Sequence, residues 1–155
     1  MTTEEQLIDT WRIQNRINLY LLDSIPEEQL KDQLSSKGRN VGEQFAHIHN
    51  VRLLWLNASA PELMQDQVKL EKEHGFNKTV LKDALENSST AMEKLLAKGL
   101  SESKVKNFKP HPMAFFGYFI AHEAHHRSAI ILALKQSGHP VDKKTGYGIW
   151  EWGSR

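Results

Sequence analysis

Apolar residues recur every three or four positions along most of this chain, the spacing that places them on one side of an α-helix. Four long segments follow this pattern: residues 3–23, 41–57, 79–96 and 111–136. No segment alternates apolar and polar residues as a half-buried strand does, and no Gly-rich phosphate loop occurs. We therefore predict an all-α protein, a single domain over residues 1–155 that forms a four-helix bundle.

Polar residues and glycines mark the ends of these segments. Asn40 can cap a helix that starts at Val41, and Glu43, three residues further on, completes the capping-box pattern. Pro112 suits the first turn of the last helix, because that position needs no amide donor. Gly99 and Gly138 are typical of helix ends, so we expect the third helix to stop near Gly99 and the fourth near Gln136.

The last seventeen or so residues differ from the rest of the chain. They contain glycines and the large aromatic residues Tyr147, Trp150 and Trp152 without helical periodicity. We expect an irregular but ordered tail that folds back over an edge of the core. Trp150 and Trp152 are alternatively candidates for a substrate wall or a dimer contact.

Composition and charge narrow the classes of function. The chain has no cysteine, which excludes disulfides, thiolate metal ligands and a protein-borne thiol nucleophile. A net charge of +1 gives no general attraction to nucleic acid, and the lysines between residues 98 and 109 are typical of a solvated loop. No apolar run approaches the roughly 20 residues that cross a bilayer, and the start lacks signal-peptide features. We expect a cytoplasmic protein that binds neither nucleic acid nor membranes.

Residues 122–126, His-Glu-Ala-His-His, interrupt the most apolar part of the sequence. On a helix His122 and His126 lie about 40° apart, one turn above each other, and can reach a common metal ion. His125 lies about 60° from His122 on the side away from His126, which suits a helix flank. Glu123 lies about 100° from His122, and we expect it to face solvent rather than to act as a general base.

A third ligand is needed, because two histidines hold a metal weakly. In segment 41–57, His47 lies about 20° from Leu54 on the predicted buried arc, whereas His49 lies about 160° from Val51. One ion would satisfy three interior imidazoles that would otherwise each need a buried partner. We therefore predict a divalent transition metal, zinc or nickel, bound by three histidine ligands, namely His47, His122 and His126.

The same segments resemble the DinB-like superfamily of bacterial four-helix metalloproteins, which includes the damage-inducible and YfiT-type groups. The resemblance covers nearly the whole chain and rests on three motifs, namely Phe45-Ala-His47-Ile, Leu54-Trp55-Leu56, and His122-x-x-x-His126-Arg127 with Ile130. It implies metal ligation by one histidine of the first motif and two of the last, which are His47, His122 and His126. Ser128 departs from the glycine that relatives often carry at this position, and this difference leaves the ligands intact.

A competing pattern is His-Glu-x-x-His, the zinc-protease signature, in which Glu123 would activate a zinc-bound water. The third ligand of the metzincin branch would fall on Leu132, which cannot bind a metal. Such proteases also commonly hold substrate against a sheet edge, and no sheet is predicted. We therefore disfavour this interpretation.

Three imidazoles leave coordination positions open, which is typical of a catalytic site. The resemblance implies relatives that use a low-molecular-weight thiol, such as bacillithiol, mycothiol or glutathione. Without cysteine the thiol must be a cosubstrate, so our leading hypothesis is a metal-dependent S-transferase acting on a small molecule. A metal-dependent hydrolase and a non-catalytic, metal-binding stress-response protein remain alternatives. The exposed aromatic tail and the superfamily's frequent dimerisation also predict a homodimer.

Overall fold

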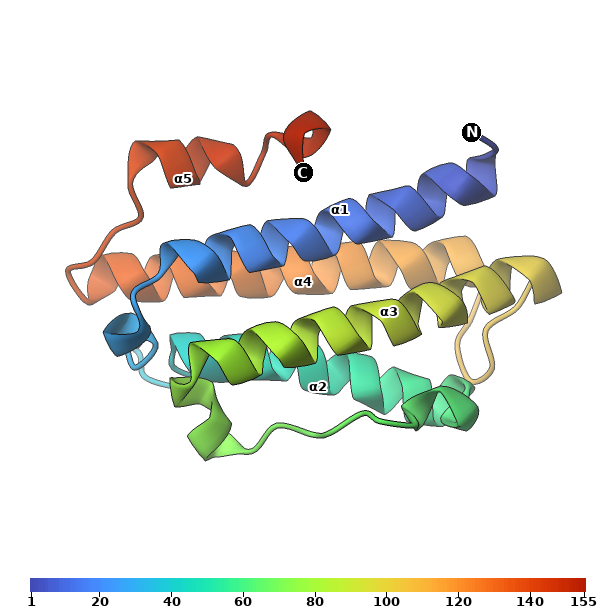
Figure 1. Cartoon of the computed structure of the whole chain (residues 1–155), viewed down its shortest axis with the longest axis horizontal. Helices are drawn as coiled ribbons and strands as arrows, with labels where there is room; N and C mark the ends of the chain where they lie inside the picture. The colour runs from blue at the N-terminus through green and yellow to red at the C-terminus, as the bar shows by residue number, and fades with distance from the viewer.

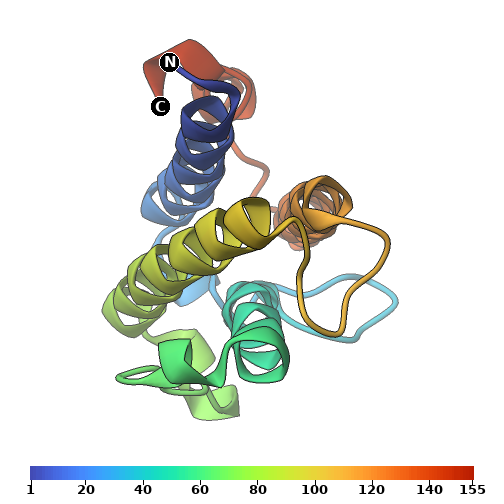
Figure 2. The same cartoon turned by 90° about the vertical axis from the view of Figure 1, so that its right-hand side faces the viewer.

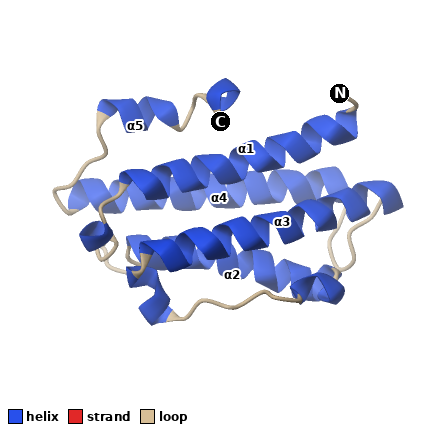
Figure 3. Ribbon diagram, in the orientation of Figure 1, coloured by secondary structure: helices blue, strands red, loops and turns tan.

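The computed structural model describes all 155 residues, and its secondary structure is helical throughout (Figure 3). The four long helices are α1 (Thr3–Ser24), α2 (Val41–Ser59), α3 (Lys78–Glu102) and α4 (Pro112–Gln136). Shorter elements are α5 (Lys143–Gly148) and the 3₁₀ turns η1 (Glu27–Gln29), η2 (Pro61–Met64), η3 (Lys72–Phe76) and η4 (Trp152–Ser154). Two isolated β-bridges are the only extended pairings. The all-α prediction is confirmed.

The four long helices lie side by side along the longest axis of the molecule (Figures 1 and 2). α1 and α4 run in one direction and α2 and α3 in the other, because residues 60–77 return along the outside of α2 before α3 begins (Figure 1). α2 packs against both α3 and α4. None of the helices combines the length and the apolar composition that a membrane-spanning segment needs.

The predicted helix starts are confirmed by their caps. The Asn40 side chain accepts a hydrogen bond from the Glu43 amide (2.8 Å), and the Glu43 carboxylate accepts one from the Asn40 amide (2.9 Å). This capping box satisfies donors that the first turn of α2 leaves without a partner. α4 begins at Pro112, and the side chain of His111 accepts from the Ala114 amide.

Two predictions were wrong, namely the end of the third helix and the irregular structure of the tail. α3 continues through Gly99 to Glu102 and ends at Ser103, which adopts the left-handed conformation (φ 54°). Gly99 serves close packing instead, because a Cβ there would lie 2.8 Å from Cγ2 of Val105 in the loop that folds back. The tail is also not wholly irregular. The Asp142 side chain accepts from the Thr145 amide and caps α5, which lies beside α1 (Figure 1).

The core consists of two apolar clusters, one towards each end of the bundle. One is formed by 14 buried residues that include Leu21, Phe45, Leu85 and Ile130. The other is formed by 11 buried residues that include Trp11, Leu56, Met92 and Phe119. In each long helix, polar buried residues fall between the members of the two clusters: Gln14 and Asn18, Arg52, Ser88, and Glu123. The clusters therefore have a polar layer between them.

A fully buried ion pair forms the centre of this layer. Arg52 Nε and Nη2 donate to the two carboxylate oxygens of Glu123 at 2.6 and 3.0 Å, and neither side chain is exposed. Gln14 and Asn18 of α1 donate to Glu123 Oε2, and Arg52 Nη1 donates to the Leu85 carbonyl oxygen of α3. All four long helices thus meet here. The expectation that Glu123 faces solvent was wrong, because its charge is neutralised inside the core.

We predict that Arg52→Met lowers the free energy of unfolding by about 3–5 kcal/mol, because it leaves the Glu123 carboxylate buried without its counter-charge. The double variant Arg52→Met/Glu123→Met should recover much of this loss, since it removes both charges. Urea denaturation measures all three proteins. As a control, Lys98→Met, which breaks the exposed Lys98–Glu62 pair, should leave stability nearly unchanged. A single Arg52 variant as stable as the wild type would contradict this account.

Candidate metal centre

Three imidazoles from two helices converge on the side of the bundle where α2 faces α4. One nitrogen from each of His47, His122 and His126 lies within 4.8 Å of the other two. The ring centroids are 4.5 Å apart for His47–His126 and for His122–His126, and 5.4 Å apart for His47–His122. Zn–N bonds of about 2.0–2.1 Å put two tetrahedral ligand nitrogens about 3.4 Å apart, and the Nε2 atoms of His122 and His126, at 3.1 Å, are close to this spacing. The group could hold a metal ion.

The three rings meet because Glu123 and Arg52, which lie on the same two helices, are buried in the core. Glu123 points into the bundle, so His122 beside it and His126 one turn from His122 lie on the flank of α4 that faces α2. On α2, Arg52 points into the bundle and His47 lies on the flank that faces α4. His126 is 7% exposed, whereas His47 and His122 are half-buried. The centre is therefore partly shielded yet reachable from solvent.

The buried arc predicted for α2 was wrong, although it led to His47. Leu54, which was placed on that arc, is 59% exposed. His49, which was placed outside it, is 1% exposed, and its Nε2 lies 2.8 Å from the Val68 carbonyl oxygen. His47 is brought to the other two histidines by facing α4, and not by facing the centre of the core.

Gln44 orients one of the three rings. Its Oε1 lies 2.6 Å from Nδ1 of His126. When this oxygen accepts, Nδ1 carries the proton and Nε2 keeps a free lone pair, as in many metal sites whose histidines bind an oxygen with the other nitrogen. His126 Nε2 lies 3.1 Å from His122 Nε2, so the free nitrogen points into the group. Sequence reasoning missed Gln44, which lies three residues before His47 on the same helix.

The ring of His122 is held by stacking. Tyr118, one turn earlier on α4, lies nearly parallel to it, with centroids 5.9 Å apart and 14° between the planes. His122 Nδ1 is buried and has no hydrogen-bond partner. Two imidazole nitrogens facing each other at 3.1 Å, beside a third ring and without a carboxylate among them, form a donor set that fits a divalent transition metal.

Burial keeps these imidazoles uncharged. It is the largest cause that lowers the pKa of His47 to about 4, the pKa of His126 to about 3, and the pKa of His122. The positive charge of Arg39 lowers all three further. At neutral pH each ring therefore offers a lone pair, which metal binding requires.

The other histidines lie outside the group. His125 is exposed, with its ring centroid 5.0 Å from that of His126, so it flanks the centre as expected. His74 accepts from the Glu71 amide, His111 caps α4, and His139 contacts the Asp32 carboxylate at 2.6 Å. These contacts give each of the three a structural role.

The position of Glu123 argues against the zinc-protease alternative. That mechanism needs the glutamate beside the ion, where it would activate water. Here both carboxylate oxygens of Glu123 bind Arg52 within the core. The His-Glu-x-x-His pattern of residues 122–126 therefore has two ligand candidates and a structural glutamate.

We predict that the metal-free protein loses stability as the pH falls from 7 to 5. An ordinary histidine has a pKa of 6.5, and the folded-state pKa values of His47 and His126 are about 4 and about 3. The unfolded chain therefore binds protons first, and the free energy of unfolding decreases from about pH 6.5 towards the folded-state values. Thermal denaturation in the presence of a chelator measures this trend. His126→Gln should show a smaller decrease, and equal decreases in both proteins would contradict the assignment.

The chain was also compared with known proteins. The sequence profile of the DinB family matches residues 1–151. Neither curated proteins nor solved structures gave a match. The matched range includes the whole four-helix bundle and the three converging histidines. The chain therefore belongs to the DinB family.

Proposed function

We propose that this protein is a metal-dependent enzyme in which His47, His122 and His126 bind one divalent transition metal ion, either zinc or nickel. We further propose that it is an S-transferase, which activates an external low-molecular-weight thiol to attack an electrophilic small molecule. The observation that carries the proposal is the convergence of three uncharged imidazoles from two helices at a half-buried place. Three protein ligands leave room for a further ligand, as in catalytic zinc sites.

In this mechanism the residues of the chain bind the metal ion and orient the imidazole rings that hold it. Burial keeps the three imidazoles neutral, Gln44 fixes the ring of His126, and Tyr118 supports the ring of His122. A bound divalent ion would supply Lewis acidity that favours the thiolate over the thiol. In the reaction the S–H bond breaks and its proton passes to solvent, a carbon–sulfur bond forms, and the leaving group departs with its electron pair. The thiol is a cosubstrate, because the chain has no cysteine.

A hydrolase that uses a metal-bound water is the closest alternative, since an open position can bind water as well as a thiol. The histidine group contains no carboxylate, and Glu123 is bound to Arg52, which leaves no acidic residue of the group to accept a proton from that water. A thiol, with a pKa of about 8.5 against about 15.7 for bulk water, depends less on such an acceptor, which favours the transferase. A non-catalytic stress-response protein, in which the ion braces the bundle, is the third candidate.

We also propose that the protein forms a homodimer. Tyr147 and Trp150 in the tail are 68% and 75% exposed, and such large apolar side chains are commonly covered by a partner. Two-fold pairs are the commonest oligomers of soluble proteins.

Metal analysis of purified protein tests the ligand set. The wild type should bind one equivalent of zinc or nickel, and His47→Ala, His122→Ala and His126→Ala should each lose most of it, because two imidazoles bind weakly. His125→Ala is the matched control and should retain the metal, since His125 lies on the exposed flank. Retention of stoichiometric metal by any two of the three ligand variants would overturn the assignment.

The same samples then distinguish the three functions. Conjugation of bacillithiol, mycothiol or glutathione to an electrophilic dye should require the metal and disappear in the ligand variants. Turnover of esters without any thiol conjugation would favour the hydrolase. If neither reaction occurs, and chelation greatly lowers the melting temperature, the ion is structural, because a catalytic ion is not needed for a bundle with its own core.

A further inference from the structure

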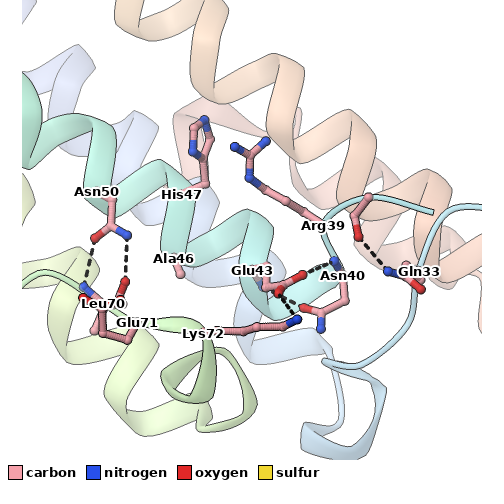
Figure 4. Close-up of a pocket in the computed structure, with 11 residues that line it drawn as sticks. Gln33, Arg39, Asn40, Glu43, Ala46, His47, Asn50, Leu70, Glu71 and Lys72 are labelled. Carbon is pink, nitrogen blue, oxygen red and sulfur yellow. Dashed lines mark hydrogen bonds and ion pairs between the residues drawn. The ribbon is translucent and has the colours of Figure 1, made fainter. Parts of the chain in front are cut away.

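An open pocket of about 680 Å³ adjoins the histidine group, with His47 at its edge (Figure 4). It is lined by the N-terminal half of α2, by the loop that precedes α2, and by residues around the start of η3. In Figure 4 the side chains of Arg39 and His47 both extend towards α4, whereas Asn50, Glu71 and Lys72 lie on the opposite side of the pocket. The pocket thus connects the candidate metal centre with one arginine.

Most polar residues of this pocket already have partners. Asn50 donates to the Leu70 carbonyl oxygen and accepts from the Leu70 amide, at 2.8 and 2.9 Å. Glu43 is held by the Asn40 amide and lies 3.8 Å from Lys72 Nζ. Glu71 lies 3.7 Å from Lys69 Nζ. These contacts leave the carboxylates of the pocket turned towards other groups.

Arg39 has no such partner. Its side chain is exposed and forms no hydrogen bond or ion pair in the structure. Its side chain lines the same pocket as His47 and extends to the side of α2 on which the ring of His47 lies (Figure 4). A molecule that extends from the histidine group into this pocket would therefore meet the guanidinium group.

The charges around the centre are not balanced by the protein. The histidine group contains no carboxylate, the Glu123 carboxylate is bound to Arg52 in the core, and the Glu43 carboxylate faces Lys72. A divalent ion would add two positive charges to that of Arg39. This positive field favours a bound molecule that carries negative charge beyond the single charge of a thiolate or hydroxide.

We propose that the small molecule bound at the three-histidine centre carries a carboxylate that pairs with the guanidinium group of Arg39. Arginine binds carboxylates through two parallel N–H donors, which gives direction as well as affinity. Arg39 is thus a specificity-determining residue that selects acids over neutral molecules of the same shape. The inference rests on the proposed function in one respect, which is that the substrate or cosubstrate occupies the histidine centre.

The test uses protein loaded with cobalt(II), whose absorption spectrum reports ligands that bind the metal. A series of ω-mercapto acids of increasing chain length is titrated beside the corresponding primary amides, which match them in shape but lack the charge. The best-fitting acid should bind wild type at least about tenfold more tightly than its amide. Arg39→Gln should abolish this preference and Arg39→Lys should keep part of it. Lys72→Gln removes an equal charge from the opposite side of the pocket and should retain the preference.

A calorimetric titration with 3-phenylpropionate and 3-phenylpropionamide adds an arm that needs no thiol. It shows whether the carboxylate belongs to the thiol or to another substrate. An acid preference that depends on Arg39 in either arm supports the inference, and equal binding of acid and amide by wild type in both arms overturns it. If no thiol binds the metal but the phenyl acid binds through Arg39, the S-transferase proposal fails while the inference stands. A wild type that takes up no metal would overturn both.

Discussion

The fold and the candidate metal centre both depend on one buried interaction, the ion pair between Arg52 and Glu123. Removing two charges from water is costly, and the cost is offset only when geometry and further hydrogen bonds are nearly complete. Here the pair has partners on α1 and α3, so all four long helices must adopt one relative position to satisfy it. A shift of α4 along α2 by one residue would leave a buried charge without its partner.

Because a helix is regular, the buried ion pair also sets the positions of the half-buried histidines on the same two helices. Once Glu123 is fixed in the core, its neighbours His122 and His126 are fixed on the flank that faces α2, and Arg52 likewise fixes His47 on the opposing flank. The imidazoles are therefore brought together by a network that they do not join. Their partial burial keeps them uncharged, and Arg39, which has no ion-pair partner, belongs to the loop before α2. The buried network thus positions the histidines, and in our proposal Arg39 of the loop selects the substrate.

The sequence was sufficient to predict the four helices and the start of α2, because apolar spacing and the Asn40–Glu43 capping box are local signals. It also predicted that His47, His122 and His126 lie together, which the structure confirms. It placed Glu123 at the surface and did not single out Arg52, because a helical wheel built on apolar residues assigns polar and charged residues to solvent. Gln44 was missed for the same reason. Gly99 was read as a helix end, although it is needed for contact with Val105.

X-ray absorption at the edge of the bound metal tests most directly whether the helices bring three nitrogen donors to one ion. The account predicts three imidazole nitrogens at about 2.0–2.1 Å for a zinc-loaded protein. One or more oxygen ligands should complete the coordination shell, and an added thiol should replace one of them with sulfur. A coordination shell with fewer than three imidazoles, or one that is unchanged in His47→Ala, would contradict it.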